Sequence, residues 1–311
     1  ENGGGVFFAG ASGPITLEMS NAIVRGNTAG GAGGGVMIDS ASEYKFTIGN
    51  ALITGNTAKD GAGVSFTASG ATGEGLIANA TIHGNDADER TGGIRYSMDT
   101  SDALFDIVNS IVAGNGAAFS DYGEVNVEQG SESNPAQIAH TLIDGAFIFG
   151  GFDSALGSDG GGNIGGSPLF KSPIDPVDAP TTAGDMRLNW ASPAIDRGDF
   201  ERIPNALEGE FRLYNTGLAG TERTAGDDAD MGAYEGGAFA SGTSRPTDDR
   251  LIVDATASNN RGGESWANPY RTLQAALIAV RNAQAAGALF PSPAVSIWIA
   301  EGTYTPDKGP S

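Results

Sequence analysis

Few side chains of this protein are grouped in a way that would support catalysis. The best group lies between Arg95 and Asp99, with Asp102 close behind, while Arg25 and His83 fall in another recurring segment. Paired carboxylates with a nearby basic residue are the groups by which polysaccharide lyases and hydrolases act. No second carboxylate recurs at a matching position, so the pattern favours solvated strand residues over an active site.

Acidic loops offer a second kind of chemistry, the binding of calcium. Asp227, Asp228 and Asp230 lie close together, and Asp153 and Asp159 fall in another glycine-rich stretch. Calcium prefers oxygen ligands from flexible loops. Neither stretch matches a twelve-residue calcium-binding loop or a nonapeptide array, so a solvated acidic loop is the alternative, and no cofactor is required.

Histidine, cysteine and tryptophan add little to this inventory. His83 and His140 are isolated from each other, and the absence of cysteine excludes disulfides and thiol chemistry. Of the three tryptophans, Trp190, Trp266 and Trp298, the last two fall near the C-terminus, where closing a core explains them better than carbohydrate binding.

The elements that would position these residues are set by an internal repeat. A seven-residue motif with the form Asn-x-x-x-x-Gly-Asn begins at residues 21, 50, 79 and 109, and a degenerate copy of it begins at His140. The spacings between successive copies are 29, 29, 30 and 31 residues. A glycine-rich marker with the same period precedes an apolar run: Gly3–Val6, Gly33–Val36, Gly61–Val64 and Gly92–Ile94. Repeats of this length indicate stacked structural units.

Each period holds three short β-type runs separated by Gly, Asn or Ser/Asp turns. Three such strands and their turns fill about 30 residues, which is too short for a unit with a crossover helix. The sequence therefore predicts an all-β chain, a right-handed parallel β-helix with three parallel sheets and about 30 residues per coil.

The recurring asparagines have a structural interpretation. At one point of successive coils, an Asn amide can donate to one neighbour and accept from the other, and Asn tolerates left-handed turn geometry. We expect two ladders, which comprise Asn21, Asn50, Asn79 and Asn109 in one column and Asn27, Asn56, Asn85 and Asn115 in the other. A row of ligand-binding amides is the alternative.

These motifs resemble the Gly-Gly-Ala/Gly-Ile/Val and Asn-x-Ala/Thr repeats of polymorphic outer-membrane-protein-type β-helices, in the pectin-lyase-like superfamily. Segments further along strengthen the resemblance: Gly162–Phe170, Met186–Leu188, Ser192–Asp199 and Asp230–Glu235. Their order is similar to the last coil and cap of large bacterial secreted proteins with C-terminal surface anchors. The resemblance covers residues 3–236 and implies that residues 1–236 are coils and a closing cap.

The composition changes after a polar linker at residues 237–250. A strand begins at Leu251, and a second strand surrounds Trp298. Between them, Leu273, Leu277 and Val280 have the spacing of an apolar helix face. In the same family this resembles the N-terminal start of a β-helix. Residues 251–311 are therefore expected to form a strand–helix–strand cap module that completes a β-helix.

The order of these parts is inverted, because the starting cap follows the coils and the chain begins in mid-coil. We expect head-to-tail assembly in which the cap module completes the next copy, through an interface comprising Val6, Phe7, Phe8, Ile297, Trp298, Ile299 and Tyr304. A circularly permuted monomer is the alternative, since about 14 extended linker residues at ~3.3 Å each could span the coils. A junction between two tandem β-helix domains is a third interpretation.

The charge balance limits the partners. With 17 Lys+Arg against 38 Asp+Glu, the net charge is −21, which excludes a nucleic-acid binder and disfavours anionic membranes. No apolar run approaches a membrane span. We expect an extracellular or cell-surface structural protein, a non-enzymatic fibre or stalk subunit that binds itself. A polysaccharide-active enzyme and a surface adhesin fragment are the alternatives.

Overall fold

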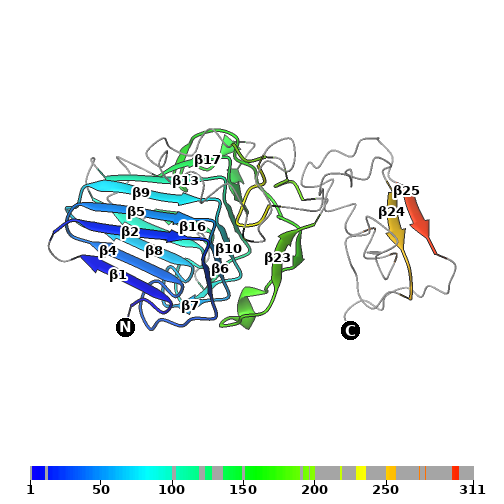
Figure 1. The fold of residues 1–311 in the computed structure, drawn as a ribbon, viewed down its shortest axis with the longest axis horizontal. Coiled ribbons are helices and arrows are strands. Elements are labelled where there is room, and N and C mark those ends of the chain that lie inside the picture. Colours follow the sequence, from blue (N-terminus) through cyan, green and yellow to red (C-terminus); the bar gives the residue numbers. More distant parts are fainter. Residues whose placement is uncertain are drawn as a thin grey trace.

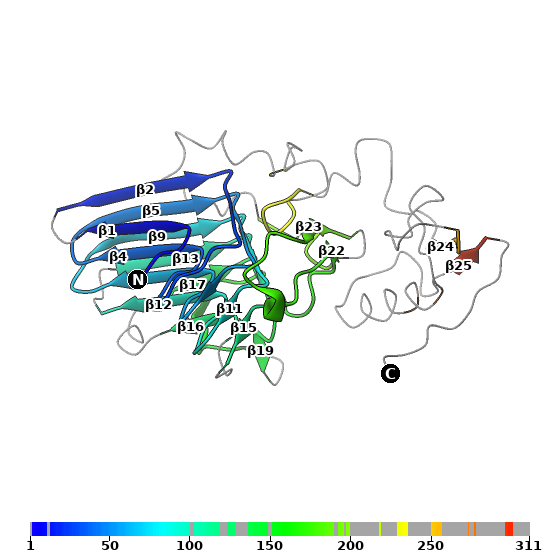
Figure 2. The same ribbon diagram turned by 90° about the horizontal axis from the view of Figure 1, so that it is seen from below.

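The protein is an all-β solenoid in which parallel strands stack coil upon coil through about four turns (Figure 1, Figure 2). The computed structural model describes residues 2–10, 13–99, 103–118, 123–127, 136–148, 151–189, 192–195, 197–199, 218, 229–235, 250–256, 273, 277 and 296–300. The fold class predicted from the repeat is confirmed, because the equivalent strands of successive coils pair in parallel.

Three main sheets run the length of the solenoid. Sheet A consists of β1 (Val6–Gly10), β4 (Val36–Ser40), β8 (Val64–Ala68), β12 (Ile94–Met98) and β16 (Val125–Val127). Sheet B consists of β2 (Ile15–Ser20), β5 (Tyr44–Gly49), β9 (Gly73–Ala78), β13 (Ala103–Val108), β17 (Gln137–Ala139) and β21 (Ser158–Asp159). Sheet C consists of β3 (Ile23–Arg25), β6 (Leu52–Thr54), β10 (Thr81–His83), β14 (Ile111–Ala113) and β18 (Leu142–Ile143).

A fourth, narrow sheet adds to the three that the sequence predicts. Sheet D consists of β7 (Thr57–Ala58), β11 (Asp86–Ala87) and β15 (Gly116–Ala117). Strands of two residues are too short to show an alternating apolar pattern. Small side chains from this sheet and the adjacent turns, among them Ala58 and Ala87, form a compact cluster of their own.

The seven-residue motif builds two consecutive corners of each coil. The first Asn of each motif, and His140 in the degenerate copy, has a positive φ of 46–52° and turns the chain from sheet B to sheet C. After the short sheet C strand, the motif glycine also has a positive φ, as at Gly55 with 59°. Asn and Gly are the residues that adopt this left-handed geometry at low cost, which explains why they recur at these positions.

Apolar side chains from sheets A, B and C fill the interior. Phe46, Phe66 and Phe105 pack edge to face or tilted, with ring centroids 4.8 Å apart for the first pair and 5.5 Å for the second. All three are no more than 2% exposed. Stacked aromatic rings of this kind join neighbouring coils across the core.

The chain leaves the coils near residue 165 and packs along the side of the solenoid. Before this point, β19 (Phe147–Ile148) and β20 (Gly151–Phe152) form a small hairpin. After it, we define residues 170–188 as the side segment. It contains β22 (Phe170–Ser172), the 3-10 helix η1 (Pro176–Asp178) and β23 (Asp185–Leu188), and β22 pairs antiparallel with β23.

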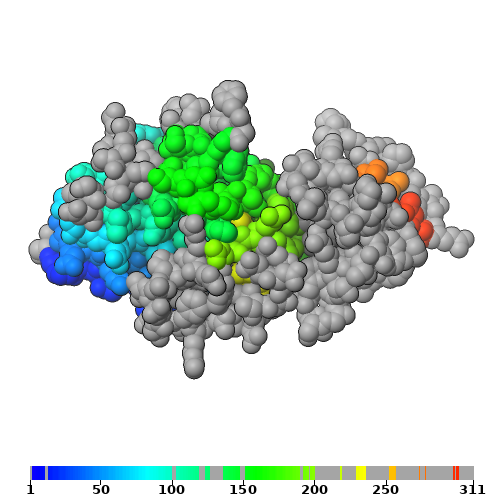
Figure 3. Space-filling view, turned by 90° about the horizontal axis from the view of Figure 1, so that it is seen from above, coloured from blue at the N-terminus to red at the C-terminus, as the bar shows by residue number. Residues whose placement is uncertain are grey.

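This side segment covers the outer face of sheet C. Phe170, Ile174, Met186 and Leu188 form a second apolar core with Leu52, Ile111 and Leu142 of the sheet, and residues 229–235 complete it. In the space-filling view the coils follow one another from blue to green, with the side segment beside them (Figure 3). Strands β6, β10, β14 and β18 of sheet C are therefore buried on both faces, whereas Ile23 and Arg25 of the first strand, β3, are exposed.

Near the C-terminus the structure describes one parallel strand pair. β24 (Arg250–Val253) pairs with β25 (Ser296–Ile299), and Leu273 and Leu277 between them are helical. Most of the linker at 237–250 and of the expected helix lies outside the described residues. Among the described residues, no helix has the length and apolarity needed to span a bilayer.

Candidate functional site

The second asparagine column forms a continuous hydrogen-bonded ladder inside the corner between sheets C and D. Nδ2 of Asn27 donates to Oδ1 of Asn56, Asn56 donates in the same way to Asn85, and Asn85 to Asn115, each at 2.9 Å. The backbone N–H of each donor residue bonds to the same oxygen at 3.0–3.1 Å. Each amide thus ties its coil to the next one.

The ladder ends on a partly buried carboxylate that lies outside the repeat. Glu124 accepts from the backbone N–H of Asn115 at 3.0 Å and from its Nδ2 at 2.6 Å. The equivalent motif position one coil later is Ala146, which is fully buried and offers no amide. Burial raises the pKa of Glu124 to about 7, against the lowering effect of its bonds with Asn115.

The first column makes side-chain bonds at only some of its corners. Asn50 Nδ2 donates to Asn21 Oδ1 at 3.1 Å. The side-chain amide of Asn79 is fully buried, and neither its nitrogen nor its oxygen has a hydrogen-bond partner among the described residues. Asn109 turns away from the column and exchanges two bonds with the backbone of Asp199, at 2.8 and 2.9 Å. This column is therefore a series of left-handed turns more than a ladder.

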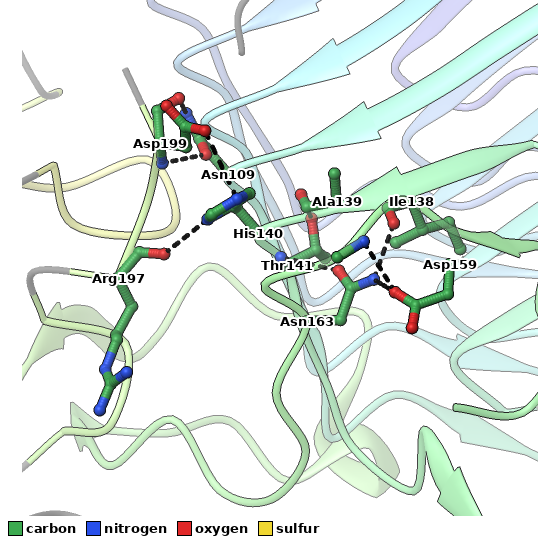
Figure 4. A network of polar contacts seen from close by, with 10 residues as sticks. Asn109, Ile138, Ala139, His140, Thr141, Asp159, Asn163, Arg197 and Asp199 are labelled. Atoms are coloured by element: carbon green, nitrogen blue, oxygen red, sulfur yellow. Dashed lines mark hydrogen bonds and ion pairs between the residues drawn. The ribbon is translucent and has the colours of Figure 1, made fainter. Parts of the chain in front are cut away.

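His140 anchors the later part of the chain at this corner (Figure 4). Its Nε2 lies 3.5 Å from Oδ2 of Asp199, and its Nδ1 lies 3.3 Å from the carbonyl of Arg197. Because His140 has a φ of 46°, it serves as a turn residue with added contacts.

Asn163 performs a ladder-like role that the motif did not reveal (Figure 4). Its Oδ1 accepts from the backbone N–H of Thr141 at 3.0 Å, and its Nδ2 donates to the carbonyl of Ile138 at 2.7 Å and to Asp159 at 2.8 Å. The seven-residue motif has ended before this point. The only signal in the sequence was the dipeptide Gly162-Asn163.

His83 connects sheet C to the side segment. Nδ1 lies 2.5 Å from the carbonyl of Ala113 and so carries the proton, while Nε2 accepts from the backbone N–H of Ile174 at 3.0 Å. Its ring packs edge to face on Phe170, with centroids 4.8 Å apart. Burial lowers the pKa of His83, so the neutral ring acts as a structural link between two layers.

Among the described residues, the sequence's catalytic candidates are not brought together as an acid/base site. Arg95 pairs with Asp60 at 3.2 Å, and Asp99 accepts from the backbone N–H of Gly70. Tyr96 and Met98, between them in sequence, point into the core and are at most 1% exposed. Arg25 lies on the edge strand β3, and Asp102 lies outside the described residues.

Of the calcium candidates, the structure describes Asp153, Asp159 and Asp230. Asp230 is 2% exposed and its backbone N–H bonds to Glu235. Asp227 and Asp228 lie outside the described residues, while Asp153 and Asp159 cap local turns. Within the described part of the chain, no group of three or more candidate ligands could hold a metal ion. Trp190 and Trp266 also lie outside it.

The first coil exposes the apolar residues that the sequence assigned to assembly. Val6 and Leu17 face the core but are only partly buried, whereas their register partners one coil on, Val36 and Phe46, are 0% and 2% exposed. Phe7, which follows Val6 on the edge strand β1, is 53% exposed. In the part of the chain that the structure describes, no strand pairs with the outer edges of β1, β2 and β3. We call this side of the first coil the open face.

The remaining assembly residues lie on or after β25. Ile297, Trp298 and Ile299 form this strand with Ser296, and Ile299 is 45% exposed. Tyr304 lies outside the described residues.

Comparison of the chain with models of protein families, with curated proteins and with solved structures finds no match. The solenoid fold therefore rests on the structure itself. Membership of the pectin-lyase-like superfamily stays an expectation from the motifs.

Proposed function

We propose that this protein is an extracellular or cell-surface structural protein, a fibre or stalk subunit that assembles head to tail. In this proposal β25 of one copy pairs with β1 of the next, so that Ile297–Ile299 stack beneath Val6–Phe8. The chain needs no cofactor for this role, and its principal partner is a second copy of itself.

The observation that carries the proposal is the difference between the first coil and the second. The interior of the second coil is sealed, with Ile38 and Ile48 both 0% exposed. The interior of the first coil is only half-covered, although its strands have the same register. A further coil on the open face would bury this apolar surface, at roughly 25 cal/mol per Å² removed from water.

The β24–β25 pair is a suitable donor for this face. Its strands run parallel, as sheet A requires, and two strands alone are marginally stable in water. Pairing β25 with β1 would make both part of a continuous sheet through β4, β8, β12 and β16. Strand addition of this kind supplies main-chain hydrogen bonds and leaves the side chains to set specificity.

The expected product is an open filament. The contact joins two different surfaces of the chain, and heterologous contacts that do not close generate linear polymers. A net charge of −21 opposes such assembly at long range, so assembly should strengthen as salt screens the repulsion. If the same module folded back onto its own first coil, the chain would instead be a closed monomer.

Three aspartate variants of matched exposure test the proposal. Phe7→Asp and Ile299→Asp place a charge on the two proposed contact surfaces, while Leu104→Asp changes a side chain that is 50% exposed on sheet B. Sedimentation velocity and electron microscopy of the full chain should show filaments for wild type and Leu104→Asp, and monomers for the other two. Filaments from all four proteins, or monomeric wild type, would overturn the proposal.

A further inference from the structure

Both histidines of the chain lie where later segments attach to the coils. The sequence contains only two, His83 and His140. His83 is on β10 under the side segment, and His140 forms the corner before β18, beside residues 197–199. Histidine is the side chain that commonly gains or loses a proton between pH 5 and pH 8. A change of pH in this range therefore acts on both attachments.

At His83 the side segment is held by a neutral ring. Nε2 accepts from the backbone N–H of Ile174 at 3.0 Å, while Nδ1 lies 2.5 Å from the carbonyl of Ala113 and carries the only ring proton. A protonated Nε2 is itself a donor and cannot accept from Ile174. Because His83 is buried, protonation also places a charge against apolar neighbours such as Phe170. Acid therefore weakens this attachment.

At His140 the polarity is reversed, because both ring nitrogens face acceptors (Figure 4). Nδ1 lies 3.3 Å from the carbonyl oxygen of Arg197, and Nε2 lies 3.5 Å from Oδ2 of Asp199. A neutral ring has one N–H and donates to only one of these two acceptors. A protonated ring donates to both and pairs with the carboxylate. Acid therefore strengthens this attachment.

The charged groups around His140 favour this response. Asp199 is the charged side chain that contacts the ring among the described residues. The guanidinium of Arg197 extends away from the ring, and the carboxylate of Asp159, on the neighbouring loop, accepts from Asn163 (Figure 4). The ring therefore meets one negative charge and no positive charge in the described part of the chain.

The response of His83 is governed by burial. Charged residues on the elements around it are Arg25 on β3, Asp86 on β11, Asp144 after β18, Asp175 beside Ile174 on the side segment, and Asp230 and Glu235 in residues 229–235. Within the described part of the chain, none of them bonds to the ring. Burial, the main cause, lowers the pKa of His83. Protonation of His83 is therefore coupled to loosening of the side segment.

We propose that the two histidines form a pH switch with opposite responses. Acidification releases the side segment at His83 and at the same time fastens residues 197–199 at His140. Release starts at the bond between Ile174 and β10 and loosens the cover over the apolar outer face of sheet C, while the chain that follows stays attached at the corner. A return to neutral pH reverses both changes. The switch needs no second copy of the chain.

Hydrogen exchange of the full-length protein at pH 5 and pH 8 tests the switch through two amides. The reporters are the N–H of Ile174, which bonds to His83, and the N–H of Asp199, which donates to Oδ1 of Asn109 at 2.8 Å. Protection is expressed relative to the intrinsic exchange rate at each pH. From pH 8 to pH 5 we expect the protection of Ile174 to fall about tenfold and that of Asp199 to rise about threefold.

Two variants assign each response to its own histidine. His83→Gln keeps an acceptor that does not titrate, and His140→Asn places at this corner the residue that forms the left-handed turn in the other coils. Each substitution should abolish the response of its own amide and leave the other within about twofold of wild type. Glu124, whose pKa burial raises to about 7, is common to all three proteins. Two amides that change in the same direction in wild type, or a response that survives the loss of its own histidine, would overturn the switch.

Discussion

Replacing Asn56 by Ala should test whether the ladder stabilises the solenoid. The side chain of Asn56 is fully buried, accepts two bonds from Asn27 and donates to Val24 and Asn85. Its removal takes the shared acceptor from the N–H and Nδ2 of Asn27, and it takes one donor from the carbonyl of Val24. Oδ1 of Asn85 keeps the backbone N–H of Asn56 as a donor.

How much the free energy of unfolding falls depends on how well water can reach those groups. A buried polar group left unsatisfied costs about 1–3 kcal/mol. Asn27 is half-exposed on the open face, so water can replace part of what it loses, while Val24 is 8% exposed and its carbonyl is less easily hydrated. We therefore expect Asn56→Ala to lower the free energy of unfolding by about 1–3 kcal/mol, measured by urea denaturation.

Asn79 provides the control, because its buried side-chain amide has no hydrogen-bond partner in the described part of the chain. Asn79→Gly keeps the left-handed turn at φ 52° and removes an unsatisfied amide, although it also removes buried packing and makes the unfolded chain more flexible. We expect this variant to lose less stability than Asn56→Ala. If Asn56→Ala unfolds at the same urea concentration as wild type, or if Asn79→Gly loses as much as Asn56→Ala, the ladder is not the stabilising element.

Two further predictions concern buried titratable groups. Burial raises the pKa of Glu124 from 4.5 to about 7, so the folded state holds this proton more tightly than the unfolded chain and loses that stabilisation as pH rises from 4.5 to 7. The stability of Glu124→Gln relative to wild type should therefore increase between pH 5 and pH 8. A constant difference would contradict the assigned burial. Burial lowers the pKa of His83, so the contribution of His83 to the free energy of unfolding is present above pH 6.5 and falls on acidification. His83→Leu should remove this pH dependence and speed hydrogen exchange at the Ile174 amide. Unchanged exchange would show that the ring does not hold the side segment.

The coil could be predicted from the sequence because its determinants are local. The first Asn of each motif marks a left-handed corner, the Gly marks the next one, and the final Asn forms the ladder. These roles need only one residue type at one spacing. The narrow sheet D was missed because two residues cannot show a period.

The covering of sheet C could not be predicted in the same way. The segment that resembled a closing cap lies along the side of the coils, with Ile174 bonded to His83 and Thr181 bonded to Gly55. The residues of these two pairs lie 91 and 126 positions apart in the sequence, so their contacts leave no periodic signal. A clue existed in strands such as Leu52–Thr54, whose residues are all buried and which therefore need a layer on each face.

Glu124 was missed for a related reason. It lies outside the motif, and its role depends on Ala146 having replaced the ladder asparagine one coil later. The break in the motif was visible, but the sequence does not say which side chain fills the gap.

The central claim, head-to-tail pairing of β25 with β1, can be tested by one cross-linking measurement. The chain has no cysteine, so single variants report without background. In the proposed register Phe7 lies opposite Trp298, and paired strands about 4.8 Å apart are within the Cα range of a disulfide. Oxidising a mixture of Phe7→Cys and Trp298→Cys proteins should give a covalent dimer, whereas Leu104→Cys with Trp298→Cys should give none. A disulfide that forms within one chain carrying both Phe7→Cys and Trp298→Cys, or between two Phe7→Cys chains, would contradict head-to-tail assembly.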